Sequence, residues 1–479
     1  MKIIMAWMVV GVGLLWSSSS SAGPAPSSPV DWGDTQDNWV SLQLTADQTP
    51  YVAYSRFEIG GNPPAIFEAR QRQWDGTDWQ MNVIETRLLQ QPYPELKLTA
   101  GPLRAHFVYN RFTGNGTTIR YRSYNPLNFG GIFLIDEDVA IVPTQHPLSV
   151  AIRSDGQPAV VYWDGGLNDV YYRRRVGPNV WTNPVAMGCS DGFPTIALST
   201  ATPLDKIRVT CVNQNQSQVR YVWEDVGGAL QANTVFPRPG DPPNHVFARP
   251  TLVLDGGLPR IVAFNQTTGA LWYAEKSGAG VNDPWNYKLV DDDPARVAPG
   301  LPVASSFVLR GNSPRIQVAY SSVNSHDLWY RQSSSIFGVD VFITDPFLVD
   351  GDCGLVSPSV SLAASSDGAT VQLGYAMVKL DNGSDSGVKH ATWKLPLTQP
   401  TSVQLNQTHN VTSMSLDLSG RPVKCFYRDD PLGDIYVEWL NNGVYQADPV
   451  AANVGLAPDY ARGCDVDVAP DGTMGVVHP

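Results

Sequence analysis

Six side chains in this sequence combine reactive or ligand-binding chemistry with a recurring place, near the ends of alternating apolar segments or just before the next one begins. The arginines offer planar guanidinium groups, which bind carboxylates through two parallel hydrogen bonds. The tryptophan can stack on a sugar ring, and the aspartate or the histidine can act as a general acid or base. The plainer alternative is that all are rim residues, polar because loops are exposed. The six candidates are Arg56, Arg111, His146, Trp163, Asp164 and Arg428.

The spacing of the usual ligand types predicts no metal centre and no cofactor. The seven histidines lack the H-E-x-x-H pattern, and none of the five cysteines lies in a C-x-x-C pair. Two acidic turns, Asp291-Asp292-Asp293 and Asp350-Gly351-Asp352, offer oxygen ligands for Ca²⁺. Neither has the spacing of an EF-hand loop, and each is better explained as an exposed acidic turn.

The elements that must position these side chains come as an internal repeat. Each unit begins with an alternating apolar strand, passes through a tight turn, and returns along a second alternating strand. Two of the turns are Asp155-Gly156 and Asp255-Gly256, and Asp-Gly between alternating strands is a strong hairpin signal. The units begin near residues 40, 94, 147, 194, 250, 302, 358, 412 and 464, with an average spacing of 53 residues.

Two further strands complete each unit. A third strand rich in aromatic residues follows, as in 169–175 and 270–276, and a less regular fourth strand leads into the next unit. Four antiparallel strands in each repeat are typical of a β-propeller. Stacked β-sandwich domains are the competing architecture, but each usually needs about 100 residues. The predicted fold class is therefore all-β, a β-propeller of four-stranded antiparallel blades.

The number of blades depends on how the ring closes. Eight full units run from 40 to 463, and half a unit follows from 464 to 479. A propeller commonly completes one blade with strands from both chain ends, and residues 30–39 are placed to supply such a strand. We predict eight blades closed in this way, with seven or nine as the alternatives.

The repeated strands and turns also resemble a known family. The apolar strand, the Asp-Gly or Ser-Gly turn and the returning strand, as in 147–163 and 412–427, resemble the repeats of sialidase-like, BNR-type propellers of secreted bacterial proteins. The resemblance covers nearly all of residues 30–479 and implies an axial ligand site, on the face that carries the loops between second and third strands. It implies architecture only, because the sequence has neither complete sialidase Asp boxes nor an Arg-Ile-Pro motif near residue 40.

The start of the chain predicts export. Residues 1–22 are interpreted as a signal peptide, with Lys2 before an apolar stretch and a small-residue cleavage site at its end. Residues 23–39 are expected to form a flexible lead-in that includes a closing strand, and residues 40–479 the propeller. We therefore predict a secreted protein, extracellular or periplasmic.

Charge and cysteine content limit the partners. A net charge of −12 without a basic run excludes a duplex nucleic acid and makes an acidic membrane surface a poor partner. Beyond the signal no apolar segment reaches the length of about 20 residues that spans a membrane, so no membrane insertion is predicted. In an oxidising compartment we predict the disulfides Cys189–Cys211 and Cys425–Cys464, with Cys353 free.

Three functions are compatible with these features. The first is a secreted ligand-binding propeller for carbohydrate binding or adhesion, since no catalytic motif is present. The second is a glycan-active enzyme, a glycosidase or polysaccharide lyase with an axial site. The third is a scaffold for extracellular proteins. An enzyme should show one asymmetric axial cluster of titratable groups, a lectin equivalent sites in several blades, and a scaffold an exposed apolar patch or an unpaired strand.

Overall fold

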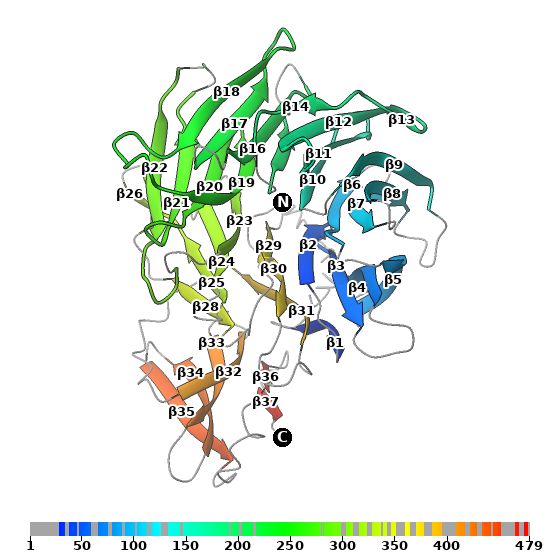
Figure 1. Ribbon diagram of the computed structural model, residues 1–479. Coiled ribbons are helices and arrows are strands. Elements are labelled where there is room, and N and C mark those ends of the chain that lie inside the picture. The colour runs from blue at the N-terminus through cyan, green and yellow to red at the C-terminus, as the bar shows by residue number, and fades with distance from the viewer. Residues whose placement is uncertain are drawn as a thin grey trace, which may run out of the picture.

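The computed structural model describes the chain as a series of antiparallel sheets (Figure 1). Side chains are discussed only for those described residues whose placement allows it. The predicted signal peptide lies outside the described residues. The described residues are 28–33, 38–45, 47–58, 66–74, 79–88, 92–100, 103–112, 116–125, 133–143, 147–190, 193–200, 204–213, 217–278, 280, 282–297, 303–309, 316–322, 328–336, 339–342, 346–350, 360–364, 370–377, 386–394, 409–416, 422–428, 434–441, 444–451, 465–468 and 474–477.

The first three blades follow the predicted repeat, each with its strands hydrogen-bonded in chain order. Two of the predicted Asp-Gly turns have the expected backbone conformation. Gly156 in the third blade has a φ of 76° and Gly256 in the fifth a φ of 57°, both in the region that favours glycine. Blade 1 contains β2 (Asn38–Leu44), β3 (Pro50–Glu58), β4 (Ile66–Trp74) and β5 (Trp79–Leu88), and blade 2 contains β6 (Glu95–Ala100), β7 (Leu103–Phe112), β8 (Thr117–Tyr124) and β9 (Ile135–Val142). Blade 3 contains β10 (Leu148–Ile152), β11 (Pro158–Asp164) and β12 (Asp169–Gly177), with the short outer strands β13 (Val180–Trp181) and β14 (Val185–Ala186).

The next three blades repeat this order. Blade 4 contains β15 (Thr195–Leu198), β16 (Ile207–Asn213), β17 (Gln218–Glu224) and β18 (Leu230–Phe236), and blade 5 contains β19 (Phe247–Asp255), β20 (Leu258–Asn265), β21 (Ala270–Lys276) and β22 (Trp285–Asp291). Blade 6 contains β23 (Val303–Leu309), β24 (Ile316–Ser322), β25 (Leu328–Gln332) and β28 (Phe347–Asp350), with the small hairpin β26 (Ser334–Ile336) and β27 (Val339–Val341) between its last two strands.

The seventh blade closes the ring. It contains β29 (Val360–Ala364), β30 (Thr370–Met377) and β31 (Ser386–Lys394), and its outer strand is β1 (Ser28–Gly33) from the start of the described chain. Antiparallel pairing joins β1 to β31, with Ser28 opposite His390. Each inner strand contacts the next, and β29 contacts β2, so the ring is complete with seven blades.

The preference for eight blades is therefore wrong, and the alternative of seven is confirmed. A strand from the N-terminal part of the chain closes the ring, as predicted. It completes the unit that starts near 358, however, and not the half unit at 464. The repeat near 412 forms a separate four-stranded sheet, and the last one a hairpin that contacts it; both lie beyond the ring (Figure 1). Their strands are β32 (His409–Leu416), β33 (Pro422–Arg428), β34 (Asp434–Asn441), β35 (Val444–Ala451), β36 (Asp465–Val468) and β37 (Met474–Val477).

Apolar side chains gather between neighbouring blades. There is a hydrophobic cluster at each of the seven interfaces, and the one between blades 7 and 1 packs Val388 with Val40 and Leu42. The third-strand aromatics were predicted to pack in this way, and Tyr221 and Trp272 do so between blades 4 and 5. The closing interface is thus built like the other six, with the same burial of apolar surface behind it.

Hydroxyl groups also link the inner strands. An inner strand is an edge of its sheet and leaves backbone groups unpaired. Among the described residues, a serine or threonine of one inner strand bonds a backbone group of the next in six of the seven neighbouring pairs. The bonds are Leu96 N to Ser41 Oγ (3.1 Å), Ile196 N to Ser149 Oγ (3.4 Å), Thr195 Oγ1 to Pro250 O (2.8 Å), Thr251 Oγ1 to Ser305 O (3.1 Å), Leu362 N to Ser306 Oγ (3.0 Å) and Leu42 N to Ser361 Oγ (2.9 Å).

Within the described segments, no helix has the length and apolar character needed to cross a membrane.

Candidate functional site

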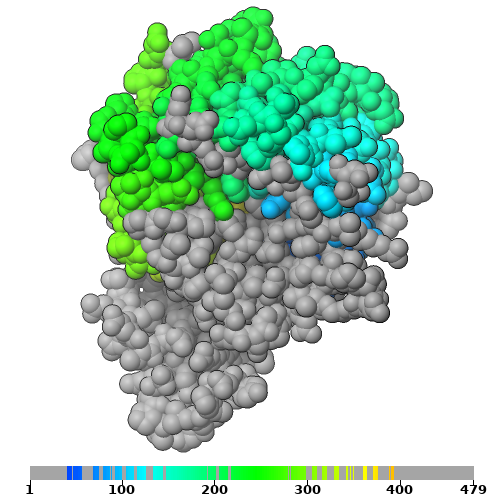
Figure 2. Space-filling view, in the orientation of Figure 1, coloured from blue at the N-terminus to red at the C-terminus, as the bar shows by residue number. Residues whose placement is uncertain are grey.

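A cavity lies on the axis of the ring. Its volume is about 330 Å³, and the inner strands of all seven blades line it. Small-molecule sites occupy about 300–1,000 Å³, so the cavity suits a small ligand. In the space-filling view, blades 2 to 5 follow one another around the ring (Figure 2). Because every blade contributes to the axial cavity, it is the first place to look for a functional site.

Strand β6 brings a carboxyl and an ammonium group to the axial cavity. Glu95 and Lys97 are two residues apart and both line it, whereas Leu96 between them is buried in the core of blades 1 and 2. The distance from Lys97 Nζ to Glu95 Oε1 is 3.2 Å. Burial raises the pKa of the Glu95 carboxyl, and the positive charge of Lys97 opposes that shift. The Glu95 carboxyl is therefore better able than a solvated one to hold a proton.

Strand β19 brings a second cation to the axial cavity. Arg249 adopts a φ of 50°, where a non-glycine residue is strained, at a shift in the register between β19 and β20. Its guanidinium carbon lies 4.6 Å from the centroid of the Phe193 ring, as a cation–π pair. Burial raises the pKa of Tyr93, and the charge of Arg249 opposes that shift. Arg249 therefore interacts with one aromatic ring by stacking and with another through its charge.

Tyr93, Phe193 and Arg249 hold the same place in three different units. Each directly precedes one of the recurrent prolines: Pro94 and Pro194 come just before β6 and β15, and Pro250 lies in the first half of β19. The starts of inner strands lie beside the ends of second strands, as in the pairing of Phe247 with Asn265. This end of the cavity is therefore on the face where the sequence predicted a ligand site.

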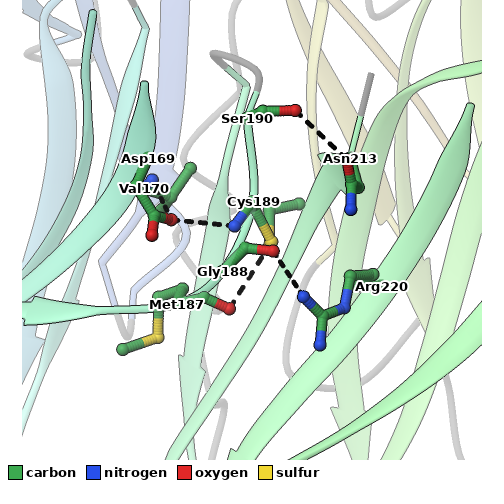
Figure 3. The surroundings of a disulfide bond; sticks show 9 residues. Asp169, Val170, Met187, Gly188, Cys189, Ser190, Asn213 and Arg220 are labelled. Carbon is green, nitrogen blue, oxygen red and sulfur yellow. Dashed lines mark hydrogen bonds between the residues drawn. A yellow bond between two sulfur atoms is a disulfide. The ribbon is translucent and has the colours of Figure 1, made fainter. Parts of the chain in front are cut away.

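The segment that leads to Phe193 is tied to its neighbours (Figure 3). The predicted disulfide Cys189–Cys211 is present, with the two Cα atoms 6.0 Å apart. Cys189 N donates to Asp169 Oδ1 at 2.8 Å, and Ser190 Oγ donates to Asn213 Oδ1 at 3.2 Å (Figure 3). Since Phe193 follows four residues after Cys189, these bonds restrict where its ring can lie beneath Arg249.

Two of the predicted site residues lie at the end of β11 and serve their own blade. Asp164 Oδ1 accepts hydrogen bonds from Gly166 N (2.9 Å) and Leu167 N (3.3 Å), and so stabilises the turn that follows. Trp163 is half-buried and packs against the cluster between blades 3 and 4. Neither belongs to the described lining of the axial cavity.

The predicted arginines are spread around the molecule. Arg56 lies near the end of β3 opposite Glu68, and Arg111 near the end of β7 opposite Thr118. Both are half-buried on the expected face, outside the described lining of the axial cavity. Arg428 ends β33, beyond the ring, and its side chain lies outside the described residues, as does all of His146. The roles predicted for these residues stay predictions.

Sequence reasoning missed Tyr93, Glu95, Lys97, Phe193 and Arg249. A signal was available, because three of them directly precede the recurrent proline, a position that His146 shares in the sequence. Glu95 and Lys97 carried no such signal, since an inner strand with charged residues looks like any half-exposed strand.

The structure describes in full only the first of the two acidic turns. The Asp291 carboxylate accepts hydrogen bonds from protein groups: Arg296 Nε donates to Asp291 Oδ2 at 2.8 Å, and the Tyr320 hydroxyl also donates to it. The second turn begins at the end of β28 and otherwise lies outside the described residues, as does the predicted pair Cys425–Cys464. Among the residues that the structure describes, no group of three or more potential metal ligands was found.

The chain is only distantly similar to known proteins. No family model matches the sequence, and no curated protein matches it. Similar solved structures include AofleA from Arthrobotrys oligospora (13% identity, 69% of this chain and 94% of that one, TM-score 0.42). An α-L-arabinofuranosidase from Fusarium graminearum (11%, 78% and 97%, 0.43) and a periplasmic gluconolactonase from Pseudomonas aeruginosa (12%, 74% and 99%, 0.44) are similar to the same degree. At these values the comparisons carry no argument about function.

Proposed function

We propose that this chain is a secreted, carbohydrate-active enzyme that cleaves a glycan at one site, the axial cavity. The observation that carries the proposal is a single asymmetric cluster of titratable groups at the axis: Glu95 and Lys97 on one inner strand and Arg249 on another. A carboxyl that lies in a cavity, is shifted in pKa by burial and has a charged partner is a candidate functional group. The disulfide Cys189–Cys211 supports an oxidising compartment and hence export.

The asymmetry favours an enzyme over a lectin with repeated sites. Although all seven blades line the cavity, its described lining has a carboxylate from β6 alone. The positions before the recurrent prolines hold different side chains, among them Tyr93, Phe193 and Arg249. A lectin built by repetition would present the same groups from several blades, whereas a reaction needs different groups in different roles.

Glu95 is the residue suited to move a proton. A carboxyl with a raised pKa can protonate the oxygen of a leaving sugar, which is general acid catalysis. Lys97, 3.2 Å away, can stabilise the carboxylate that forms once the proton has left. Phe193 lines the cavity and offers an aromatic ring against which a sugar can pack.

A binding protein without turnover is the second candidate. Glu95 is the one carboxylate in the described lining, whereas most glycosidases use a pair of carboxyl groups. This observation favours recognition of a sugar without cleavage, which was the first expectation from the sequence.

The variant Glu95→Gln separates the two candidates. We expect it to lower kcat by about 10²–10⁴-fold, because glutamine cannot donate the proton. The wild type should also lose activity as pH rises through the pKa of Glu95, a limb of the pH profile that the variant lacks. The measurement is release of reducing ends and of unsaturated uronates from a panel of neutral and acidic polysaccharides.

The matched control is Asp138→Asn, on the outer strand of blade 2, where the side chain is 59% exposed. It should leave turnover unchanged. Sugar binding without turnover by the wild type, or turnover that survives Glu95→Gln, would rule out the proposed role of Glu95; the first result would establish the binding protein instead.

A further inference from the structure

The axial cavity carries an excess of positive charge in an acidic protein. The chain has a net charge of −12, yet the charged groups in the described lining are Lys97, Arg249 and a single carboxyl, Glu95. Whenever Glu95 holds a proton, the described lining carries two cations and no anion. A neutral sugar gains little from such a field, whereas an anionic ligand is attracted by it.

The geometry of Arg249 suits a planar anion. The guanidinium carbon lies over the Phe193 ring, 4.6 Å from its centroid, and the N–H groups of a guanidinium lie in its own plane. In-plane N–H groups match the two oxygens of a carboxylate. The group is also presented by a backbone with a φ of 50°, a conformation in which a non-glycine residue is strained.

The aromatic residues near Arg249, Phe193 and Tyr93, indicate what kind of molecule carries the anionic group. Both belong to the segment just before an inner strand, and Arg249 interacts with each of them. A cavity of about 330 Å³ with aromatic faces at one end suits a small cyclic ligand better than a long chain laid lengthwise.

We propose that the axial cavity recognises a sugar acid, a uronic acid unit whose carboxylate binds the Arg249 guanidinium with Lys97 supplying a second positive charge. This inference rests on the proposed function and names the substrate class of the same site. The carboxylate holds the unit beside Arg249, so that Glu95 faces the remainder of the unit inside the cavity.

Calorimetric titration tests the proposal with D-galacturonate and D-glucuronate against D-galactose and D-glucose. The sugar acids should bind at least about 10-fold more tightly than their neutral counterparts, a difference of about 1.4 kcal/mol. Their affinity should fall as salt is added, because salt screens the charges. Arg249→Asn should remove the preference while preserving the fold, since asparagine tolerates a positive φ. Arg174→Gln, an exposed arginine on β12, is the matched control and should change nothing.

The possible results are distinct. Equal affinity for acids and neutral sugars overturns the sugar-acid proposal and leaves the proposed function standing. A preference for acids that survives Arg249→Asn overturns the assignment to Arg249. If none of the four sugars binds and no polysaccharide is turned over, both the sugar-acid proposal and the proposed function fail. Binding by Glu95→Gln with the same preference supports the sugar-acid proposal independently of turnover.

Discussion

Two histidines are buried inside the ring and kept uncharged. His106 Nδ1 lies 2.8 Å from the Tyr121 hydroxyl, and His390 Nε2 lies 2.9 Å from Gln372 Oε1. Burial lowers the pKa of His106 to about 4, with a smaller effect from the charge of Arg104, and lowers the pKa of His390 to about 3. A histidine in the unfolded chain titrates near 6.5, so unfolding takes up protons below that pH.

Acidification should therefore destabilise the ring before most carboxylates titrate. Because the unfolded state binds more protons between about pH 6.5 and the lowered values, the free energy of unfolding should fall as pH decreases through this window. The limiting slope is about 1.4 kcal/mol per pH unit for each histidine. Urea unfolding at a series of pH values from 6.5 to 5 measures it.

The substitution His390→Gln should reduce this slope by the share of one histidine while keeping a hydrogen-bond donor near Gln372. His245→Gln, at a half-buried histidine, controls for the exchange itself. Equal slopes in the wild type and in His390→Gln would contradict the prediction.

At the scale of the element, the inner strands are held by hydroxyl groups as well as by apolar packing. The bonds from Leu362 N to Ser306 Oγ (3.0 Å) and from Leu42 N to Ser361 Oγ (2.9 Å) lie on the two sides of blade 7. Each gives a partner to the amide of an edge strand, which would otherwise lose its hydrogen bond to water on burial.

Replacement of either hydroxyl should weaken the ring at that interface. We expect Ser306→Ala and Ser361→Ala each to lower the free energy of unfolding by about 1–3 kcal/mol, the cost of a buried donor without an acceptor. Denaturant melts give the value. Thr200→Ala, at an exposed threonine between blade strands, is the control. If neither serine variant lowers the free energy of unfolding by more than the control does, the prediction is contradicted and water has replaced the hydroxyl.

For the whole molecule, closure depends on a strand from the other end of the described chain. Strand β1 pairs with β31 and is the outer strand of blade 7, whereas the sheet β32–β35 and the hairpin β36–β37 form pairs only among themselves within the described residues. The ring and the later strands are thus separate units of backbone hydrogen bonding.

Two deletions should consequently behave differently. Removal of residues 28–33 exposes β31 as an edge, which should lower thermal stability and promote self-association. Removal of residues 409–479 should leave the cooperative unfolding of the ring in place. Calorimetry and light scattering of both variants test this. If the second deletion unfolds the ring, the sheet β32–β35 is an integral part of it.

Much of the fold could be predicted because its signals are local. Alternation of apolar residues, Asp-Gly turns and prolines at strand starts each act over a few residues, and the structure has strands and hairpins where they indicate. The disulfide expected for the span of 23 residues from Cys189 to Cys211 is present as well. The axial site was predicted only as a face, since His146 was named for its proline while Tyr93 and Arg249, in the same position, were passed over.

By itself the sequence determined the blade and its four strands. Only the tertiary structure decided the blade number and the lining of the axial cavity. The units at 358 and 412 carry the same pattern, yet one closes the ring and the other lies beyond it. The physical reason is that closure depends on contacts such as Val388 with Val40 and Ser361 with Leu42, between residues more than 300 positions apart. Local periodicity carries no information about which distant edges will meet.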